Sequence, residues 1–388
     1  MPYFQQITRR RFLQTASALA ASCGLSRQAR AAETSDLIAR QADPYNAEPA
    51  LAKLIAEGTT PVQHFYVRSH GPVQKVDAAA FRLRVEGLVN KPAEFTLDEI
   101  RGRFGSQTSE ATLTCAGNRR LEMNRIKPVP GVQWDAGAIG HARWSGAALS
   151  DVLRASELQD SAKHVWFEGL DPIKEKDGSV APFGSSIPLD KALAADVKVL
   201  LASGMNDEPL TAEHGFPLRA VVPGFIGARS VKWLTKIVVS DRPSPNHYVA
   251  EAYKLVQTDA KDELTAAEPI YAWPVNAAIC TPGPADKLKA GRTTIAGYAL
   301  AAGEPGCSVA KVELSTDGGT TWSGARLLGE SRSYSWRLWT TMADLAAGRH
   351  ELIVRASDSR ANAMPQQAAW NLKGYLYNGW HRVNVDVA

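Results

Sequence analysis

The segment best suited to chemistry is residues 113–120, which read Leu-Thr-Cys-Ala-Gly-Asn-Arg-Arg. Cys115 ends an apolar run and is followed by a turn of small residues and by Arg119 and Arg120. A fixed backbone position and nearby positive charges both favour the thiolate form of the cysteine, which is the form that binds a metal or attacks a substrate. Zinc is disfavoured, because no second cysteine or histidine lies at ligand spacing. These residues alone leave three interpretations open: a metal ligand, a nucleophile paired with a histidine, and a buried inert thiol beside surface arginines.

Residues 1–32 have the pattern of an export signal. Residues 8–13 read Thr-Arg-Arg-Arg-Phe-Leu, a twin-arginine motif, and an Ala-rich run and an Ala-Arg-Ala cleavage pattern follow. The twin-arginine route carries folded proteins, and insertion of a cofactor in the cytoplasm is a common reason to fold first. We therefore expect a periplasmic protein with a bound cofactor. The alternative is a basic amphipathic N-terminus that lies on the folded body.

The composition indicates a globular body that is close to neutral. Of the 388 residues, 45% are hydrophobic and 22% charged, which excludes a disordered, collagen-like or coiled-coil chain. The formal net charge of +4 comes from arginines within residues 1–32, so the remainder has no charge basis for non-specific binding to nucleic acid. No later segment has about 18 consecutive apolar residues, so no membrane span is expected.

Two domains are expected after the signal, over residues 33–255 and 256–388. The first mixes short strands and helices without βαβ alternation and lacks GxGxxG and GxxxxGK[ST] motifs, which indicates an α+β fold rather than a dinucleotide or P-loop fold. The second contains about seven short strands with turns between them, which favours an immunoglobulin-like sandwich.

Local signals predict individual elements. Residues 33–60 are polar and helix-prone. A helix over 97–103 follows Thr96 as its N-cap, and a second helix, over 147–155, is capped by Ser145. Strands are expected over residues 81–85, 165–167, 197–202, 218–223, 231–240, 293–298, 309–315, 335–340, 351–356 and 369–372.

The segment Thr114-Cys115-Ala116-Gly117-Asn118-Arg119-Arg120 resembles the signature of the sulfite oxidase family of molybdenum enzymes. Further blocks follow the family's order at residues 64–70, 134–139, 167–171, 214–219, 227–234 and 370–374. The resemblance implies a molybdopterin-binding catalytic domain followed by an immunoglobulin-like dimerisation domain. The chain contains no cytochrome b5 module and no C-x-x-C-H motif, so it is similar to a bacterial periplasmic sulfite dehydrogenase without its own haem.

The resemblance also implies a substrate site beside a molybdenum–molybdopterin cofactor. Cys115 would be the thiolate ligand of the metal. The residues implied for catalysis and substrate binding are Tyr253, Arg68, His70, Arg120, Trp134 and Lys373. Tyr253 would donate a hydrogen bond near the metal, Trp134 would form a wall, and His70 would add a charge that depends on pH.

Lys373 departs from the family pattern, because animal members carry arginine there. Lysine keeps the charge but loses the bidentate geometry, so sulfite binding would be looser unless Arg382 supplies the missing group. The residues implied for the cofactor are Tyr66, Val67, Arg68, Ser69, His70, Asp171, His214, Arg219, Ser230, Val231 and Lys232.

The resemblance implies sulfite as substrate, an external c-type cytochrome as electron acceptor and a homodimer. Three alternatives stay open: a sulfane dehydrogenase or nitrate reductase of the same superfamily, a methionine-sulfoxide reductase type, and a catalytically silent binding protein of the same fold. Cys280 and Cys307 form either a disulfide or two inert thiols.

Overall fold

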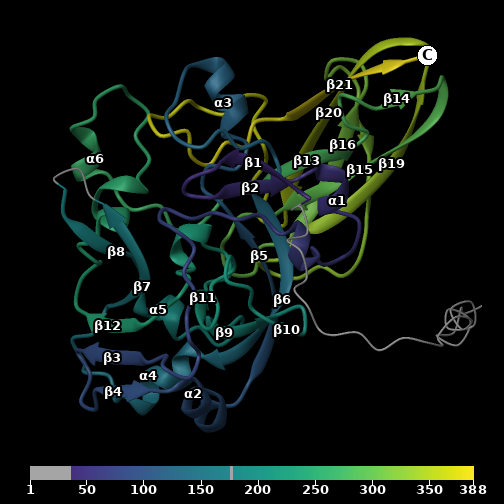
Figure 1. Cartoon of the computed structure of the whole chain (residues 1–388). Coiled ribbons are helices and arrows are strands. Elements are labelled where there is room, and N and C mark those ends of the chain that lie inside the picture. Colours follow the sequence, from purple (N-terminus) through teal and green to yellow (C-terminus); the bar gives the residue numbers. More distant parts are fainter. Residues whose placement is uncertain (1–35, 175–177) are drawn as a thin grey trace, which may run out of the picture. The chain divides into compact units, whose positions relative to one another are not determined.

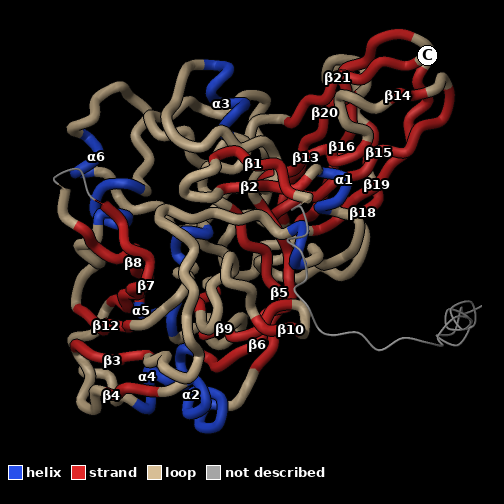
Figure 2. The backbone as a smooth tube through the Cα atoms, viewed as in Figure 1, coloured by secondary structure: helices blue, strands red, loops and turns tan. Residues whose placement is uncertain are grey.

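The computed structural model describes residues 36–174 and 178–388, which belong to one compact unit, Asp36–Ala388. Strands dominate this unit and are gathered into five sheets (Figures 1 and 2). The predicted twin-arginine motif and cleavage site lie outside the described residues. Among the helices of the described part, none is long and apolar enough to cross a bilayer.

The sheet that leads to Cys115 is five-stranded and antiparallel. Strands β5 and β6 pair without interruption from Gln107 opposite Gly146 to Thr114 opposite Ile139, so residue 115 leaves the end of a regular ladder. The strands are β5 (Gln107–Thr114), β6 (Ile139–Ala148), β9 (Leu200–Met205), β10 (Glu208–Pro209) and β11 (Arg219–Val221).

A second five-stranded sheet is mixed, since β12 runs parallel to β3 and antiparallel to β7. Its strands are β3 (Leu83–Gly87), β4 (Ala93–Phe95), β7 (His164–Lys174), β8 (Val180–Pro188) and β12 (Lys236–Ser240). Leu83, Val165 and Ile237 from these strands are fully buried in the largest hydrophobic cluster, together with Val152 and Leu153 of a covering helix. The predicted mixture of short strands and helices is confirmed over this part of the chain.

Short helices connect the strands. They are α1 (Leu51–Leu54), α2 (Leu97–Phe104), α3 (Arg120–Ile126), α4 (Leu149–Ala155), α5 (Leu189–Ala192), α6 (Glu263–Ala266), the 3-10 turns η1 (Val62–His64) and η2 (Gly227–Arg229), and the π-helical turn η3 (Tyr248–Ala252). The predicted cap of α2 is confirmed, because Thr96 and Glu99 exchange hydrogen bonds as a capping box. The predicted cap Ser145 is wrong, because it lies within β6 and α4 follows Ala148.

The first described segment is a hairpin where a helix-prone surface segment was expected. β1 (Leu37–Gln41) pairs with β2 (Asn46–Pro49), all four residues of which are buried. The Asn46 side chain accepts a hydrogen bond from the Ser69 N–H, and Ala47 exchanges backbone hydrogen bonds with Val67. These tertiary contacts override the local helix propensity.

The C-terminal part consists of a four-stranded and a five-stranded sheet that share one hydrophobic cluster, and its strands gather at the upper right of Figure 1. The first sheet contains β13 (Asn276–Thr281), β15 (Gly291–Leu300), β18 (Arg326–Leu327) and β19 (Arg337–Leu345). The second contains β14 (Lys287–Leu288), β16 (Val309–Ser315), β17 (Ser323–Gly324), β20 (Gly348–Asp358) and β21 (His381–Val387).

Two expectations for this part are corrected or resolved. The strand predicted over residues 369–372 is wrong, because this segment is a loop that brings Lys373 toward Arg120. Cys280 and Cys307 are free and buried, each in a different hydrophobic cluster, which contradicts the disulfide alternative.

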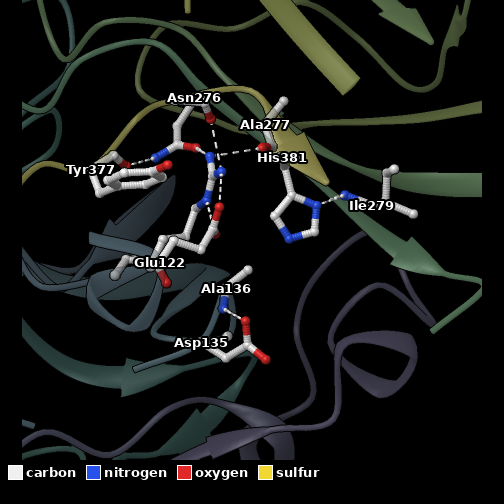
Figure 3. A network of polar contacts seen from close by, with 12 residues as sticks. Glu122, Asp135, Ala136, Asn276, Ala277, Ile279, Tyr377 and His381 are labelled. Atoms are coloured by element: carbon white, nitrogen blue, oxygen red, sulfur yellow. Dashed lines mark hydrogen bonds and ion pairs between the residues drawn. The ribbon is translucent and has the colours of Figure 1, made fainter. Parts of the chain in front are cut away.

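A buried arginine ties the turn after Cys115 to the C-terminal strands. Arg119 is fully buried and donates hydrogen bonds to both carboxylate oxygens of Glu122 and to Asn276 Oδ1. Figure 3 shows Asn276 between Tyr377 and Ala277, and its side-chain amide donates to the carbonyl of Tyr377. Since buried polar groups stabilise a fold only when they are satisfied, this network holds the turn in one position.

Candidate active site

The turn that carries Cys115 is closed by backbone hydrogen bonds. The Cys115 N–H donates to the carbonyl of Ala138 at 2.9 Å, and the Asn118 N–H donates to the carbonyl of Cys115 at 2.9 Å. The Gly117 N–H lies 3.4 Å from Cys115 Sγ and donates to it. The end of β5 and this turn therefore fix the position of a buried sulfur atom.

Arg120 lies against this turn as the first residue of α3. A Cβ atom at position 117 would lie 2.6 Å from Arg120 Cζ, so glycine is required there for the guanidinium to approach. Arg120 Nε donates to the carbonyl of Lys373 at 3.1 Å, and Nη1 donates to the carbonyl of Val132 at 2.9 Å. The guanidinium also lies over the ring of Tyr375, which completes its fixation.

Two cavities meet at Cys115, and Arg68 and Tyr253 also line both. The inner cavity is lined by Phe65, Tyr66, Arg68, Ser69, His70, Leu113, Cys115, Asp171, Phe183, Glu213, His214, Arg219, Gly227, Ala228, Ser230, Lys232 and Tyr253. The outer cavity, of about 530 Å³, is lined by Arg40, Gln41, Arg68, Cys115, Arg120, Pro130, Gly131, Val132, Gln133, Tyr253, Lys373 and Tyr375.

The residues predicted for the cofactor gather in the inner cavity with two exceptions. Those that line it are Tyr66, Arg68, Ser69, His70, Asp171, His214, Arg219, Ser230 and Lys232. Val67 lies outside the lining and pairs through its backbone with Ala47. Val231 is buried in the adjoining hydrophobic cluster. These two residues shape the cavity through packing rather than by facing it.

The residues predicted for the substrate are divided between the cavities. Arg68 and Tyr253 lie at their junction, His70 lines the inner cavity, and Arg120 and Lys373 line the outer cavity. Trp134 lines neither of them. It is fully buried in a cluster that includes Cys115, and its Nε1 atom has no hydrogen-bond partner among the described residues.

The inner cavity holds cations that are buried and bound to protein acceptors. Arg219 donates to the carbonyls of His214 and Ser230 at 2.9 and 3.1 Å. Burial lowers the pKa of Arg219 to about 10, so it stays charged at neutral pH. Burial, reinforced by the neighbouring Arg219 and Lys232, lowers the pKa of His214 to about 3, so its imidazole is neutral.

Lys232 and Asp171 are the two inner groups that titrate near neutrality. Lys232 Nζ donates to Ser69 Oγ and to the carbonyl of Glu213, both at 2.8 Å. Burial, reinforced by Arg219, lowers the pKa of Lys232 to about 7, and burial raises the pKa of Asp171 to about 6. Asp171 Oδ1 is buried and lacks a hydrogen-bond partner among the described residues.

Tyr253 enters the junction directly after the π-helical turn η3, and its hydroxyl shares a hydrogen bond of 2.9 Å with His70 Nε2. Burial raises the pKa of Tyr253, so its hydroxyl stays protonated at neutral pH. Burial and the charges of Arg68 and Lys232 lower the pKa of His70 well below its ordinary value. In this structure His70 is thus neutral at neutral pH, where the sequence suggested a pH-dependent charge.

Lys373 contributes to the outer cavity as predicted, whereas Arg382 does not. Arg382 lies on β21 and forms an ion pair of 2.7 Å with Glu351 of the neighbouring strand. The suggestion that Arg382 replaces the family arginine is therefore not supported by its position.

The sequence missed several residues that line the cavities or fix them. Arg40 and Gln41 come from β1, Tyr375 stacks on Tyr253 with ring centroids 5.2 Å apart, and Asn46 accepts a hydrogen bond from Arg68. Tyr375 could have been suspected from its place directly after the block at residues 370–374. Neither Arg40 nor Asn46 had a sequence signal, because the hairpin that positions them was not foreseen.

Comparison with known proteins defines the class. Residues 70–248 match the family model described as "Oxidoreductase molybdopterin binding domain", and residues 267–388 match "Mo-co oxidoreductase dimerisation domain". The solved structure of the sulfane dehydrogenase SoxCD from Paracoccus pantotrophus has the same fold, with a TM-score of 0.77 at 23% identity over 97% of this chain and 99% of that chain. The chain is therefore a molybdopterin-binding oxidoreductase.

The chain belongs to the sulfite oxidase family. It is 43% identical over 354 residues to sulfite oxidase of Gallus gallus, covering 87% of this chain and 75% of that protein. It is 38% identical to sulfite oxidase of Arabidopsis thaliana, and the match covers 88% of this chain and 91% of that protein. The chain spans only 65% of the human mitochondrial sulfite oxidase, to which it is 40% identical over 89% of this chain.

The residues of the inner cavity fit the molybdenum–pterin group that this family implies. Cys115 supplies a soft sulfur donor of the kind that suits a redox metal. Arg219 and Lys232 supply positive charge and N–H donors for a phosphate. Asp171 Oδ1 is a buried acceptor that lacks a partner among the described residues, and the N–H groups of a pterin ring would satisfy it.

Proposed function

We propose that the protein is a sulfite dehydrogenase, which oxidises sulfite to sulfate and passes the electrons singly to an external c-type cytochrome. The lining of the outer cavity carries this proposal. Arg68, Arg120 and Lys373 face it beside Cys115, and none of its described lining residues is an acid. Such a site favours small sulfur oxyanions, because fixed cations with planar donor forks match their oxygen atoms.

The arginines bind and orient the anion. Arg120 Nε and Nη1 are held by backbone carbonyls, while Nη2 makes no hydrogen bond to the described residues and is available to a ligand. Arg68 Nη1 donates to Asn46 Oδ1 and to the carbonyl of Ser69, which fixes its plane at the junction of the cavities. Because both groups are held before a ligand enters, binding requires little reorganisation.

The Tyr253 hydroxyl keeps its proton at the junction of the two cavities. This buried, protonated hydroxyl donates a hydrogen bond to an oxygen of the anion, and the neutral His70 orients that hydroxyl through the hydrogen bond the two side chains share. When bound, the molybdenum cofactor supplies the two-electron oxygen-atom-transfer chemistry. In the balanced overall reaction, sulfite and water yield sulfate, two protons and two electrons, and the electrons leave to the external acceptor.

The proposal includes a cellular location, an oligomeric state and a fold for the C-terminal domain. The twin-arginine pattern of residues 8–13 supports export of the folded protein to the periplasm, where c-type cytochromes are found. The match of residues 267–388 to a dimerisation domain supports a homodimer, and two facing sheets around one core support an immunoglobulin-like sandwich for this part.

The test is molybdenum content and electron transfer to cytochrome c, measured on the exported protein. We expect molybdenum in the folded protein and reduction of cytochrome c that depends on sulfite. Thiosulfate, a protein-bound sulfane and nitrate serve as competing substrates. Faster turnover with the sulfane would favour the sulfane dehydrogenase alternative, and a folded, exported protein without molybdenum would contradict the proposal.

A further inference from the structure

One wall of the outer cavity comes from the hairpin at the start of the described chain. Arg40 and Gln41, at the end of β1, line this cavity together with Arg68, Arg120 and Lys373. Both residues lie upstream of residues 70–248 and 267–388, the segments matched by the family models. A fourth cation thus faces the cavity from an element outside the matched domains.

A buried carboxylate fixes the position of Arg40. Arg40 Nε donates to Glu48 Oε1, and the side chain of Glu48 is only 1% exposed. The two oxygens of Glu48 also accept hydrogen bonds from the N–H groups of Asp135 and Gly137, at 2.8 and 2.9 Å. Glu48 is therefore held on both sides, and it anchors one edge of the Arg40 guanidinium to the rigid segment before β6.

The other edge of the guanidinium remains available. Arg40 Nη2 forms a long ion pair of 3.9 Å with the half-exposed Asp135 carboxylate, and neither Nη atom donates a hydrogen bond to a described residue. The side chain is 25% exposed, as expected for a group that lines an open cavity. A planar guanidinium that is anchored through Nε and open at both Nη atoms is suited to bidentate binding of an oxyanion.

We propose that Arg40 is a substrate-binding residue of the outer cavity, where it attracts and holds the sulfur oxyanion together with Arg68, Arg120 and Lys373. Glu48 acts as its positioning residue. Sulfite as the ligand rests on the function proposed above. An additional fixed guanidinium offsets the lost bidentate geometry at Lys373, because the cavity gains a planar donor fork from β1.

The test compares Arg40→Gln with the wild-type holoenzyme in two measurements, sulfate binding by titration calorimetry and steady-state kinetics with sulfite. We expect the Kd for sulfate and the KM for sulfite to rise about tenfold, the loss expected for one hydrogen bond to a charged group. The kcat should change by less than about twofold, because an interaction that holds the anion equally in the ground state and the transition state affects KM alone. The rise in KM should shrink with added salt.

Arg292→Gln is the matched control, since Arg292 is exposed on β15 and lines neither cavity. It removes the same net charge and should leave the Kd for sulfate unchanged. If Arg40→Gln does not fold, Arg40→Lys tests the same site. This variant keeps the positive charge beside Glu48 and removes only the planar pair of N–H donors. We expect about a threefold rise in the sulfate Kd for this variant.

The two proposals fail in different ways. If Arg40 only tethers the hairpin, its variants will lower the melting temperature but leave the sulfate Kd and the sulfite KM unchanged, which would overturn the inference. If the wild-type protein binds sulfate through Arg40 but does not oxidise sulfite, the proposed function fails and the anion site at Arg40 stands.

Discussion

The inner and outer cavities share Cys115, Arg68 and Tyr253, yet their other cations are held in opposite ways. In the inner cavity, Arg219 is buried and Lys232 is partly buried, both donate to protein acceptors, and desolvation lowers the pKa of each. In the outer cavity, Arg40 is 25% exposed and makes no hydrogen bond from either Nη atom to a described residue, and Arg120, although buried, keeps such a free donor at Nη2.

This difference separates a site for a resident group from a site for an exchanging ligand. Buried cations with lowered pKa values gain most from a permanent anionic partner, because that partner offsets their cost of desolvation. Cations that keep free N–H donors toward an open cavity are hydrated again when a ligand leaves, so binding and release stay reversible. The inner cavity is therefore suited to a cofactor phosphate, and the outer cavity to sulfite and sulfate.

A pair of substitutions tests this division with the largest expected effect. Lys232→Met should lower the molybdenum content of the purified protein by more than about tenfold, since it removes a desolvated cation that would bind the anionic phosphate of the cofactor. Arg120→Met should leave the molybdenum content near that of the wild type and raise the sulfite KM by more than about tenfold. Molybdenum analysis and steady-state kinetics on both variants provide the readout. If Arg120→Met lost molybdenum and Lys232→Met kept it, the distinction between a cofactor cavity and a substrate cavity would be wrong.

Stability of the cofactor-free protein should depend on pH through Lys232. Its folded pKa of about 7 lies below that of an unfolded lysine, so the unfolded state binds more protons and stability rises with pH. Raising the pH from 7 to 9 should add about 2 kcal/mol to the free energy of unfolding from this group, an increment that Lys232→Met should lack. Thermal unfolding of both apoproteins across this range measures it. Equal pH slopes would show that Lys232 is not desolvated in the apoprotein.

The smallest effect is expected for a substitution of Lys373, which lines the outer cavity. Lys373→Arg restores a planar fork where the chain has a single ammonium group, and the apparent KM for sulfite should fall about threefold with kcat unchanged. Steady-state kinetics at fixed ionic strength measures the change. An unchanged or higher KM would show that position 373 contributes through charge alone.

The sequence predicted the residues at the junction of the two cavities more successfully than the residues that line the rest of the outer cavity. Cys115, Arg68 and Tyr253 come from segments far apart in the chain, and the family resemblance implied that all three lie at one site. Local signals also predicted α2, because an N-cap such as Thr96 acts on the backbone of its own helix and needs no tertiary contact.

The errors occurred where tertiary contacts decide the structure. The β1–β2 hairpin was not expected, since its stability comes from contacts such as that between Asn46 and Ser69 rather than from propensity. Arg40 was missed for the same reason. Trp134 was expected to form a wall of the substrate site but is fully buried, and no pattern in the sequence distinguishes a buried tryptophan from one that lines a cavity.

The most direct test concerns the sulfur atom shared by the two cavities. X-ray absorption at the molybdenum edge should be compared between the wild-type protein and Cys115→Ser, together with sulfite-dependent reduction of cytochrome c. We expect the variant to show one sulfur neighbour fewer around the metal and activity at background, because oxygen is a poorer donor than thiolate to this metal. Identical sulfur coordination in both proteins, or full activity in the variant, would contradict the assignment of Cys115 as the metal ligand.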